Sequence, residues 1–308
     1  MTNKPSLVDF RALGPAAFVL LLALGHSPAA AQQTSSEDRT RQLWNTAFRA
    51  KRPAAPTPAS TSTSTATAAP NSPAAPPLQL GEEDPGDSLV GITVWRLRPS
   101  LPEDDKDMRI SSLDGGGDLT PERIEAETPL REGEKVRVSI EAARSGYLYV
   151  IDREQYADGS FGTPYLIFPT LRTHGGNNEV VAGRLVDIPA WDDRPRYFTM
   201  QPSRPDQTAE VLTILITPDP LPGLRIRRDP LRLTTDEVAA WEKRWGAKVQ
   251  RLEARGQTGK SYTKAEKEAA TDRTRLLTHD EPLPQTMYRL ETKPGEPMLL
   301  NISLKIQQ

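Results

Sequence analysis

The residues of this chain that could carry out chemistry are acidic side chains in one stretch, RSGYLYVIDREQYADGSFG (144–162). The stretch begins as an apolar run and ends in a polar segment that contains Asp152, Glu154 and Asp158. Carboxylates in a loop can bind Ca²⁺, and a pair of them can act as acid and base in a hydrolase. The other interpretation is a strand of a β-sandwich followed by an ordinary acidic loop.

A calcium loop of the EF-hand type needs oxygen ligands at alternate positions and a glycine at the turn. Here Tyr156 replaces a ligand and Asp158-Gly159 comes two residues late, so this spacing fails. A looser Ca²⁺ site completed by Asp114 and Asp118 stays open, as does a carboxylate pair facing each other across a cleft. We expect a solvated loop, because nothing selects these acids from the 41 in the chain.

Two other patterns with catalytic meaning are weak. ARGQTGKS (254–261) places Gly259, Lys260 and Ser261 as in a phosphate-binding loop, which requires a buried strand before it and a helix directly after it. A helical pattern precedes it instead, so we expect a polar connection between helices. His174 and His279 stand alone, whereas a histidine-based zinc enzyme needs two or three at defined spacing. We therefore predict no metal and no cofactor.

The N-terminal 31 residues predict export. Lys4 and Arg11 precede an apolar run over 16–24, and Ala29-Ala30-Ala31 ends the segment like a signal-peptide cleavage site. We expect a periplasmic or extracellular bacterial protein with no transmembrane helix after cleavage; an uncleaved anchor is the alternative. The chain has no cysteine, which excludes disulfides and thiol nucleophiles. Its formal net charge of −2 does not favour nucleic-acid binding.

Residues 32–86 divide into two segments before the folded region. Residues 32–52 have short helical character, with Trp44 and Phe48 on one side. Residues 53–86 are rich in Pro, Ala, Ser and Thr, so we predict a disordered linker that cannot bury enough apolar surface to fold. We interpret 32–52 as a tail that follows the signal, with a tethered docking peptide as the alternative.

Residues 87–308 predict a mainly β domain. In LVGITVWRLR (89–98), Val90, Ile92 and Val94 alternate with residues of the other face, and EKVRVSIEA (134–142) repeats the pattern. Pro and Gly clusters separate the apolar runs, which favours an antiparallel β-sandwich, immunoglobulin-like or related, over alternating β–α units. A terminal β-hairpin is expected over 285–306, with its turn at PGEP.

Two C-terminal α-helices are expected as an insertion over 234–280, before that hairpin. Each begins with a capping box, TTDE (234–237) and TKAE (263–266). The first helix is expected to continue to Gly256, because Trp241, Trp245, Val249 and Leu252 then share one face. We expect that face to pack against the sheet.

Five runs in a fixed order carry a resemblance: REGEKVRVSIEA (131–142), SGYLYVIDRE (145–154), YLIFPT (165–170), NNEVVAGRLVDIP (177–189) and AEVLTILITP (209–218). Together they resemble a family of exported bacterial modules called domain of unknown function four-three-eight-four, over residues 119–224. The resemblance implies a small β-rich domain of exported or envelope proteins, sometimes appended to kinases or caspase-like peptidases. It implies no catalytic residues, so none is assigned.

Five loop residues remain as candidates for partner binding: Tyr156, His174, Asn177, Asn178 and Trp191. Aromatic side chains in polar loops often mark contacts, and loops at one end of a sandwich commonly bind partners. The sequence therefore predicts a non-enzymatic module that binds a protein or glycan partner in the cell envelope. An exported carboxylate-based, metal-assisted hydrolase and a structural component of an envelope assembly are the alternatives.

Overall fold

The computed structural model describes residue 48 and residues 51–54, 88–113, 115–272, 274–293 and 295–307. All of them belong to the unit Thr34–Gln308. The predicted signal peptide (1–31) and residues 55–86 of the predicted linker lie outside the described residues. So does the predicted helical segment 32–52, except for Phe48, Lys51 and Arg52.

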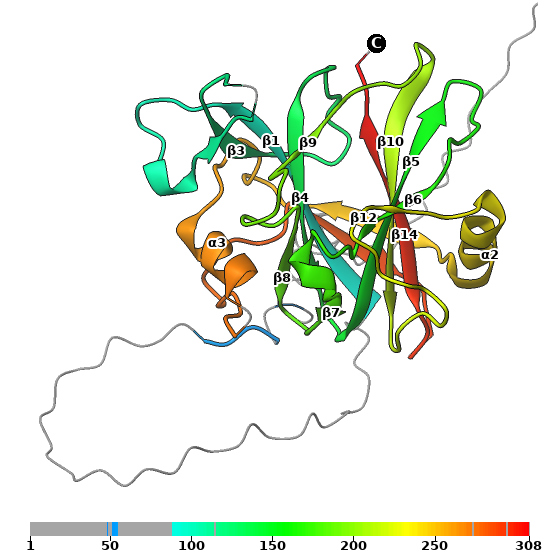
Figure 1. Cartoon of the computed structure of the whole chain (residues 1–308). Helices are drawn as coiled ribbons and strands as arrows, with labels where there is room; N and C mark the ends of the chain where they lie inside the picture. Colours follow the sequence, from blue (N-terminus) through cyan, green and yellow to red (C-terminus); the bar gives the residue numbers. More distant parts are fainter. Residues whose placement is uncertain are drawn as a thin grey trace, which may run out of the picture. The chain divides into compact units, whose positions relative to one another are not determined.

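Alternating apolar residues build two antiparallel sheets whose inner faces share one core (Figure 1). Val90, Ile92 and Val94 of β1 (Leu89–Pro99) lie in this core, as their alternation predicted, together with Leu212 and Ile214 of β10 (Gln207–Thr217). Successive side chains of a strand point to opposite faces, so every second residue of these strands points into this core. The predicted fold class, a mainly β antiparallel sandwich with two helices, is confirmed.

The large sheet is organised around β1, which pairs with β4 along one side and with β13 and then β3 along the other. Within the described residues this sheet has eight strands: β12 (Val249–Glu253), β13 (Thr286–Leu290), β1, β3 (Asp118–Ile124), β2 (Ile110–Ser111), β4 (Lys135–Ala142), β8 (Leu185–Ile188) and β9 (Phe198–Thr199).

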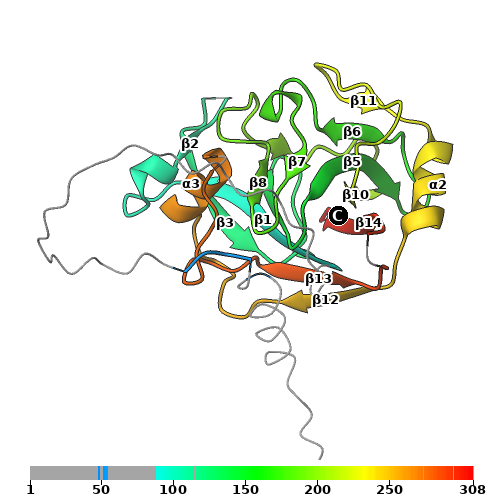
Figure 2. The same cartoon turned by 90° about the horizontal axis from the view of Figure 1, so that it is seen from below.

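The small sheet is organised around β5 and β10, which pair over almost their whole length. In the described part of the chain it has six strands: β11 (Leu231–Arg232), β6 (Tyr165–Phe168), β5 (Gly146–Tyr156), β10, β14 (Met298–Lys305) and β7 (Glu179–Val180). Helix α2 (Thr235–Trp245) lies beside the small sheet, and α3 (Lys264–Thr271) lies on the opposite side of the sandwich (Figure 2). Two short 3₁₀ helices are η3 (Lys106–Met108) and η4 (His174–Gly176).

The first C-terminal helix is shorter than predicted. Its capping box is present at Thr234 and Glu237, but α2 ends at Trp245, and Gly246 caps it. The residues that were expected to continue it form β12, which pairs with β13. Glycine is about 1 kcal/mol less favourable than alanine inside a helix, whereas pairing with β13 satisfies the backbone of β12 with ladder hydrogen bonds.

The last two strands are present where the sequence predicted them, but they do not pair with each other. β13 pairs with β1 and β12 in the large sheet, and β14 pairs with β10 in the small sheet. The chain therefore passes from one layer of the sandwich to the other between Leu290 and Met298. Two strands joined by a short turn read as a hairpin in sequence, and only the neighbours of each strand decide the pairing.

The outer face of β4 is polar and buried. Glu141 lies there and accepts two hydrogen bonds from Arg52, at 2.8 and 2.6 Å, and both side chains are at most 2% exposed. Arg52 also donates to the carbonyl oxygen of Pro282. Phe48 is fully buried beside Leu89 and other apolar residues of this face. The segment that precedes the Pro-rich stretch is thus bound to the domain itself.

Helix α3 covers the other part of this outer face through a second polar network. Asp187 of β8 accepts hydrogen bonds from Ser139 Oγ at 2.6 Å, Tyr262 Oη at 2.6 Å and Arg137 Nη2 at 3.0 Å. Next to it, Glu266 of α3 forms a buried ion pair with Arg123 of β3. The buried charges of Asp187 and Glu266 therefore each have an opposite partner, as burial of charged groups requires.

Candidate ligand-binding pocket

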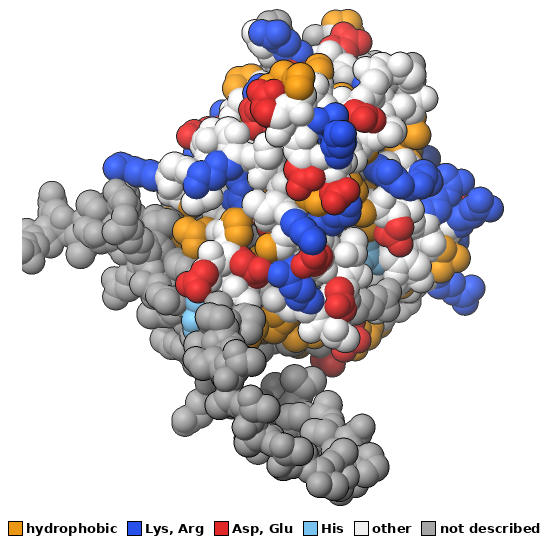
Figure 3. Space-filling view, turned by 90° about the vertical axis from the view of Figure 1, so that its left-hand side faces the viewer, with side chains coloured by type: hydrophobic (Ala, Val, Ile, Leu, Met, Phe, Trp, Pro, Cys, Tyr) orange, Lys and Arg blue, Asp and Glu red, His pale blue; other side chains and the backbone are white. Residues whose placement is uncertain are grey.

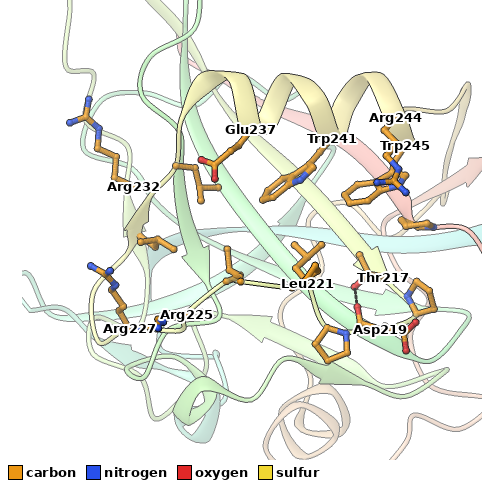
Figure 4. A pocket seen from close by; sticks show the side chains of 18 residues that line it. Thr217, Asp219, Leu221, Arg225, Arg227, Arg232, Glu237, Trp241, Arg244 and Trp245 are labelled. Atoms are coloured by element: carbon orange, nitrogen blue, oxygen red, sulfur yellow. Dashed lines mark hydrogen bonds between the residues drawn. The ribbon is translucent and has the colours of Figure 1, made fainter.

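A cavity lies between α2 and the segment that joins β10 to β11, and we call it the α2 pocket. It has a volume of about 740 Å³ (Figure 4). Its walls come from residues 217–233, from α2 and from Pro297. Volumes between about 300 and 1,000 Å³ are typical of sites for small ligands.

The connecting segment PDPLPGLRIRRDP (218–230) forms one wall and carries little regular structure because proline cannot donate a backbone hydrogen bond. It is nevertheless fixed. Thr217 Oγ1 donates to the carbonyl oxygen of Asp219 at 2.6 Å, and Leu221 N donates to Tyr149 Oη at 2.9 Å. Leu171 N donates to the carbonyl oxygen of Arg227 at 2.7 Å. The wall is therefore held in place before any ligand binds.

Two tryptophans form the opposite wall. Trp241 and Trp245 are one turn apart on α2, and their rings are nearly parallel, at 23° and with centroids 6.2 Å apart. Both are half-buried and pack against the buried cluster that includes Leu215, Leu233 and Val238. Both indoles point from the helix into the pocket (Figure 4). The predicted packing of this face on the sheet is present, and the rings also remain open to the cavity.

Helix α2 is tied to the small sheet on its other side, which fixes the two rings. Val238 is fully buried. Glu242 forms an ion pair with Arg153 of β5 and accepts a hydrogen bond from Asn301 Nδ2 of β14 at 2.9 Å. The tryptophans thus stand on a rigid element, and rigid elements hold binding groups in place more accurately than loops do.

Positive charge predominates in the α2 pocket. Four arginines line it: Arg225, Arg227, Arg232 and Arg244. Within the described part of the chain none of the four guanidinium groups forms a hydrogen bond or an ion pair, although Arg244 lies 5.4 Å from the Trp245 ring. The two acids are Asp219 and Glu237. Hydrogen bonds from Thr234 at the helix N-terminus lower the pKa of Glu237, so its charge is already compensated.

The five candidate residues from the sequence are not gathered at this pocket. Tyr156 is buried, donates a hydrogen bond to Glu154, and lies 3.9 Å below the guanidinium of Arg204. Trp191 is also buried, between Tyr262 and Arg137. Both aromatic rings are thus largely packed within the fold.

The other three candidates lie near one another, around η4. His174 has a positive φ of 51°, and its Nε2 contacts the carbonyl oxygen of Asp187 at 3.1 Å. Asn177 Oδ1 accepts from Glu179 N, and the buried Asn178 donates to the carbonyl oxygen of Leu148. His174 and Asn177 line a second cavity of about 480 Å³, which Trp191, Tyr156 and Asn178 do not line. Their role in partner binding stays a prediction.

The acids that the sequence singled out lie in a different setting from the one expected. Asp152 and Glu154 belong to β5, on the face that carries Val150 toward the core, and only Asp158 lies in an exposed turn. The expectation of a solvated loop is wrong for the first two, because β5 extends five residues beyond its apolar run. Glu210, which the sequence did not single out, faces Glu154 across the β5–β10 pairing.

Asp152, Glu154 and Glu210 converge at a cavity of about 520 Å³. Asp152 Oδ1 and Glu210 Oε2 are buried and accept no hydrogen bond from the described residues. Burial, followed by repulsion from Glu210, raises the pKa of Asp152 well above 3.8. Burial likewise raises the pKa of Glu210. The pair therefore favours one shared proton, as two neighbouring carboxylates do.

The looser calcium site is not assembled. Asp118 lies on β3 of the large sheet, where it accepts a hydrogen bond from Ser111 Oγ at 3.0 Å, whereas Asp152 lies on the small sheet. Asp114 lies outside the described residues. Among the described residues no group of three or more His, Asp or Glu side chains is arranged to hold a metal ion.

The ARGQTGKS segment is built into the large sheet. Gly259 N donates to the carbonyl oxygen of Arg123 at 2.9 Å, and Tyr262 N donates to that of Pro121 at 3.0 Å. Lys260 N closes a local turn to Gln257. A phosphate cradle needs free backbone N–H groups, and these are already used. The segment joins β12 to α3, so the expected connection between two helices is corrected to one between a strand and a helix.

Charges of both signs are interspersed on the face that lies on the left of Figure 1, as the space-filling view shows (Figure 3). None of the described helices is long and apolar enough to cross a membrane. Comparison with known proteins found no matching family model, no matching curated protein and no matching solved structure.

Proposed function

We propose that this chain is an exported, non-enzymatic β-sandwich module that binds a protein or glycan partner in the bacterial cell envelope, with the α2 pocket as its ligand site. The observation that carries this proposal is the pairing of two half-buried tryptophans with four arginines that lack ion-pair partners among the described residues. Tryptophan and arginine dominate binding energies at recognition sites. The N-terminal 31 residues, which resemble a signal peptide in composition, support export.

The pocket is also held in place before a ligand binds, which lowers the free energy spent on ordering the protein. Its loop wall is fixed by hydrogen bonds from Thr217 and Leu221, and α2 is fixed by Glu242. Association with a preformed site spends less free energy on ordering the protein than association with a mobile one. This supports recognition rather than a structural filler role for the two rings.

The test is capture of partners from a bacterial envelope fraction by the immobilised chain. We expect bound material that is lost when both Trp241 and Trp245 are replaced by alanine and retained when the exposed Leu113 is replaced by alanine. Thermal unfolding of each variant checks that the fold persists. Equal capture by the wild type and the double variant would contradict the proposal.

A second candidate function is a carboxylate-based hydrolase, which the convergence of Asp152, Glu154 and Glu210 favours. Glycosidases separate their two carboxyl groups by ~5 to ~9.5 Å so that the sugar fits between them, and one of the two is a general acid. A general acid with a raised pKa is still a group that hydrolases use. Hydrolysis of chromogenic glycosides, esters or peptides by the wild type and not by Glu210→Gln would establish this function, and no turnover of any of them would contradict it.

A further inference from the structure

We propose that the partner recognised by the α2 pocket is an acidic glycan, a chain of sugar rings that carries carboxylate groups such as uronic acids. This inference rests on the proposed function, since it names the ligand of the same pocket. It is carried by three features of the pocket: the distribution of its arginines, the exposure of its tryptophan rings and the scarcity of backbone donors along residues 218–222.

The arginines favour an anionic ligand, and they lie on both sides of the two tryptophan rings. Arg225, Arg227 and Arg232 lie at one end of the pocket, and Arg244 lies at the other end beside Trp245 (Figure 4). A guanidinium group binds a carboxylate through two parallel hydrogen bonds, which gives direction as well as strength. A ligand that satisfies both ends has acidic groups separated by an uncharged, ring-sized portion.

The tryptophans supply the surface for that uncharged portion. Two nearly parallel indoles one helical turn apart form a row of flat apolar surfaces along the pocket. The face of an indole is electron-rich, so it attracts the polarised C–H groups on the face of a sugar ring. Pyranose rings in a chain repeat along one direction, as these two indoles do.

A peptide partner fits the same walls less well. Peptides that bind as strands or extended segments need backbone donors and acceptors from the protein. In the wall formed by residues 218–222, three of five residues are prolines, which have no N–H, and Leu221 N already donates to Tyr149. Binding of a helix needs a continuous apolar groove, but arginines bound this one at both ends. Along residues 218–222 the ligand therefore meets side chains rather than free backbone donors.

The test is isothermal titration of the purified full chain with three probes: oligogalacturonate, the same oligomer with its carboxyl groups reduced, and poly-glutamate of matched charge. We expect oligogalacturonate to bind, with an affinity that falls as salt is raised. We expect the reduced oligomer and poly-glutamate to bind at least tenfold more weakly, since each lacks one of the two recognised features.

Variants assign the binding to the pocket. Arg227→Glu with Arg232→Glu changes only exposed side chains, and we expect it to lower the affinity at least tenfold and to remove most of the salt dependence. Arg289→Glu is the matched control, an exposed charge reversal on β13, and we expect it to leave the affinity unchanged. Trp241→Ala should weaken binding at high salt as well as at low salt.

The outcomes separate this inference from the proposed function. Preference for poly-glutamate, or equal binding of the reduced oligomer, overturns the acidic-glycan inference. Absence of oligogalacturonate binding also overturns it, while tryptophan-dependent capture from the envelope fraction keeps the proposed function. If the tryptophan substitutions change neither the capture from the envelope fraction nor the binding of oligogalacturonate, the proposed function and the acidic-glycan inference are both overturned.

Discussion

Arg52 and Glu141 form a buried, two-fold hydrogen-bonded ion pair between residues 89 positions apart in the chain. The pair anchors the segment 51–54 to the outer face of β4, and Phe48 fills the apolar cluster next to it. The Pro-rich stretch begins and ends at the same domain, so it does not separate the domain from residue 48 as a spacer would. Phe48 and Arg52, which belong to the expected tail, therefore bind to the domain of their own chain.

Replacing Arg52 by alanine should destabilise the fold strongly. The substitution leaves the Glu141 carboxylate buried without its partner, and removing one member of a buried pair costs ~3–5 kcal/mol. Urea unfolding of the full chain measures the effect. Arg172→Ala is the control, because Arg172 and Asp229 form an exposed pair worth ~0–1 kcal/mol. Equal effects of the two substitutions would show that Arg52 is not anchored as described.

Cutting the chain between Ala66 and Thr67, at an inserted protease site, should leave the two pieces associated. The buried contacts of Phe48 and Arg52 hold the N-terminal piece after its covalent link is lost. Co-elution of both pieces in size exclusion is the expected result, and Phe48→Ala with Arg52→Ala should release the N-terminal piece. Separation of the wild-type pieces at micromolar concentration would contradict docking in cis.

Asp152 and Glu210 should make stability fall as pH rises from about 4 toward neutrality. The folded state raises the pKa of Asp152, mainly through burial, so over this range it binds more protons than the unfolded state. Its unfolding free energy therefore decreases as pH rises toward the folded-state pKa. Asp152→Asn removes the charge and should increase the unfolding free energy at pH 7 relative to wild type. The difference in unfolding free energy between the variant and wild type should become smaller as pH falls.

Asp158→Asn is the control for this pH effect and should act with the opposite sign. Hydrogen bonds from Ser160 lower the pKa of Asp158, so its ionised form favours the folded state. Its contribution is present above the ordinary pKa of 3.8 and is lost as pH falls further. Urea midpoints between pH 3 and 8 test both variants. A difference in stability between wild type and Asp152→Asn that does not vary with pH would contradict the shared-proton pair.

Tyr262→Phe should destabilise the region beneath α3. Tyr262 Oη donates to Asp187, and its removal takes one of three hydrogen bonds from a buried carboxylate, at a cost of ~1–3 kcal/mol. Burial also raises the pKa of Tyr262 well above 10, so this phenol should stay protonated when exposed tyrosines ionise in an ultraviolet titration. Tyr165→Phe, at an exposed tyrosine, is the control. Loss of stability in both variants to the same degree would argue against a special role for Tyr262.

Strand positions were predictable where a local period of two was present. The alternation of Val90, Ile92 and Val94 required only that one face of β1 be apolar, and the structure buries that face. The capping boxes at the starts of α2 and α3 were equally local, since each satisfies N–H groups within four residues. The end of α2 was not predictable from the same pattern, because Val249 and Leu252 suit a helix face as well as a strand.

The binding pocket was only partly predictable. Trp241 and Trp245 were expected on one helix face, but the cavity beside them depends on where residues 218–230 cross the small sheet. The five loop candidates were chosen by residue type, and the structure engages Tyr156 and Trp191 in packing instead. A high density of arginine in LRIRR (224–228), close before a capped helix with two tryptophans, was the signal that could have indicated the site.

Sequence alone determined what short-range physics controls: the β periodicity, the helix starts, the prolines that break the wall of the pocket and the absence of cysteine. The tertiary structure decided which distant residues meet. Glu210 lies opposite Glu154 because of the β5–β10 register, and Arg52 meets Glu141 across 89 positions of the chain. Local patterns reflect the backbone conformation of a few residues, whereas burial and charge pairing depend on neighbours that the fold supplies from elsewhere in the chain.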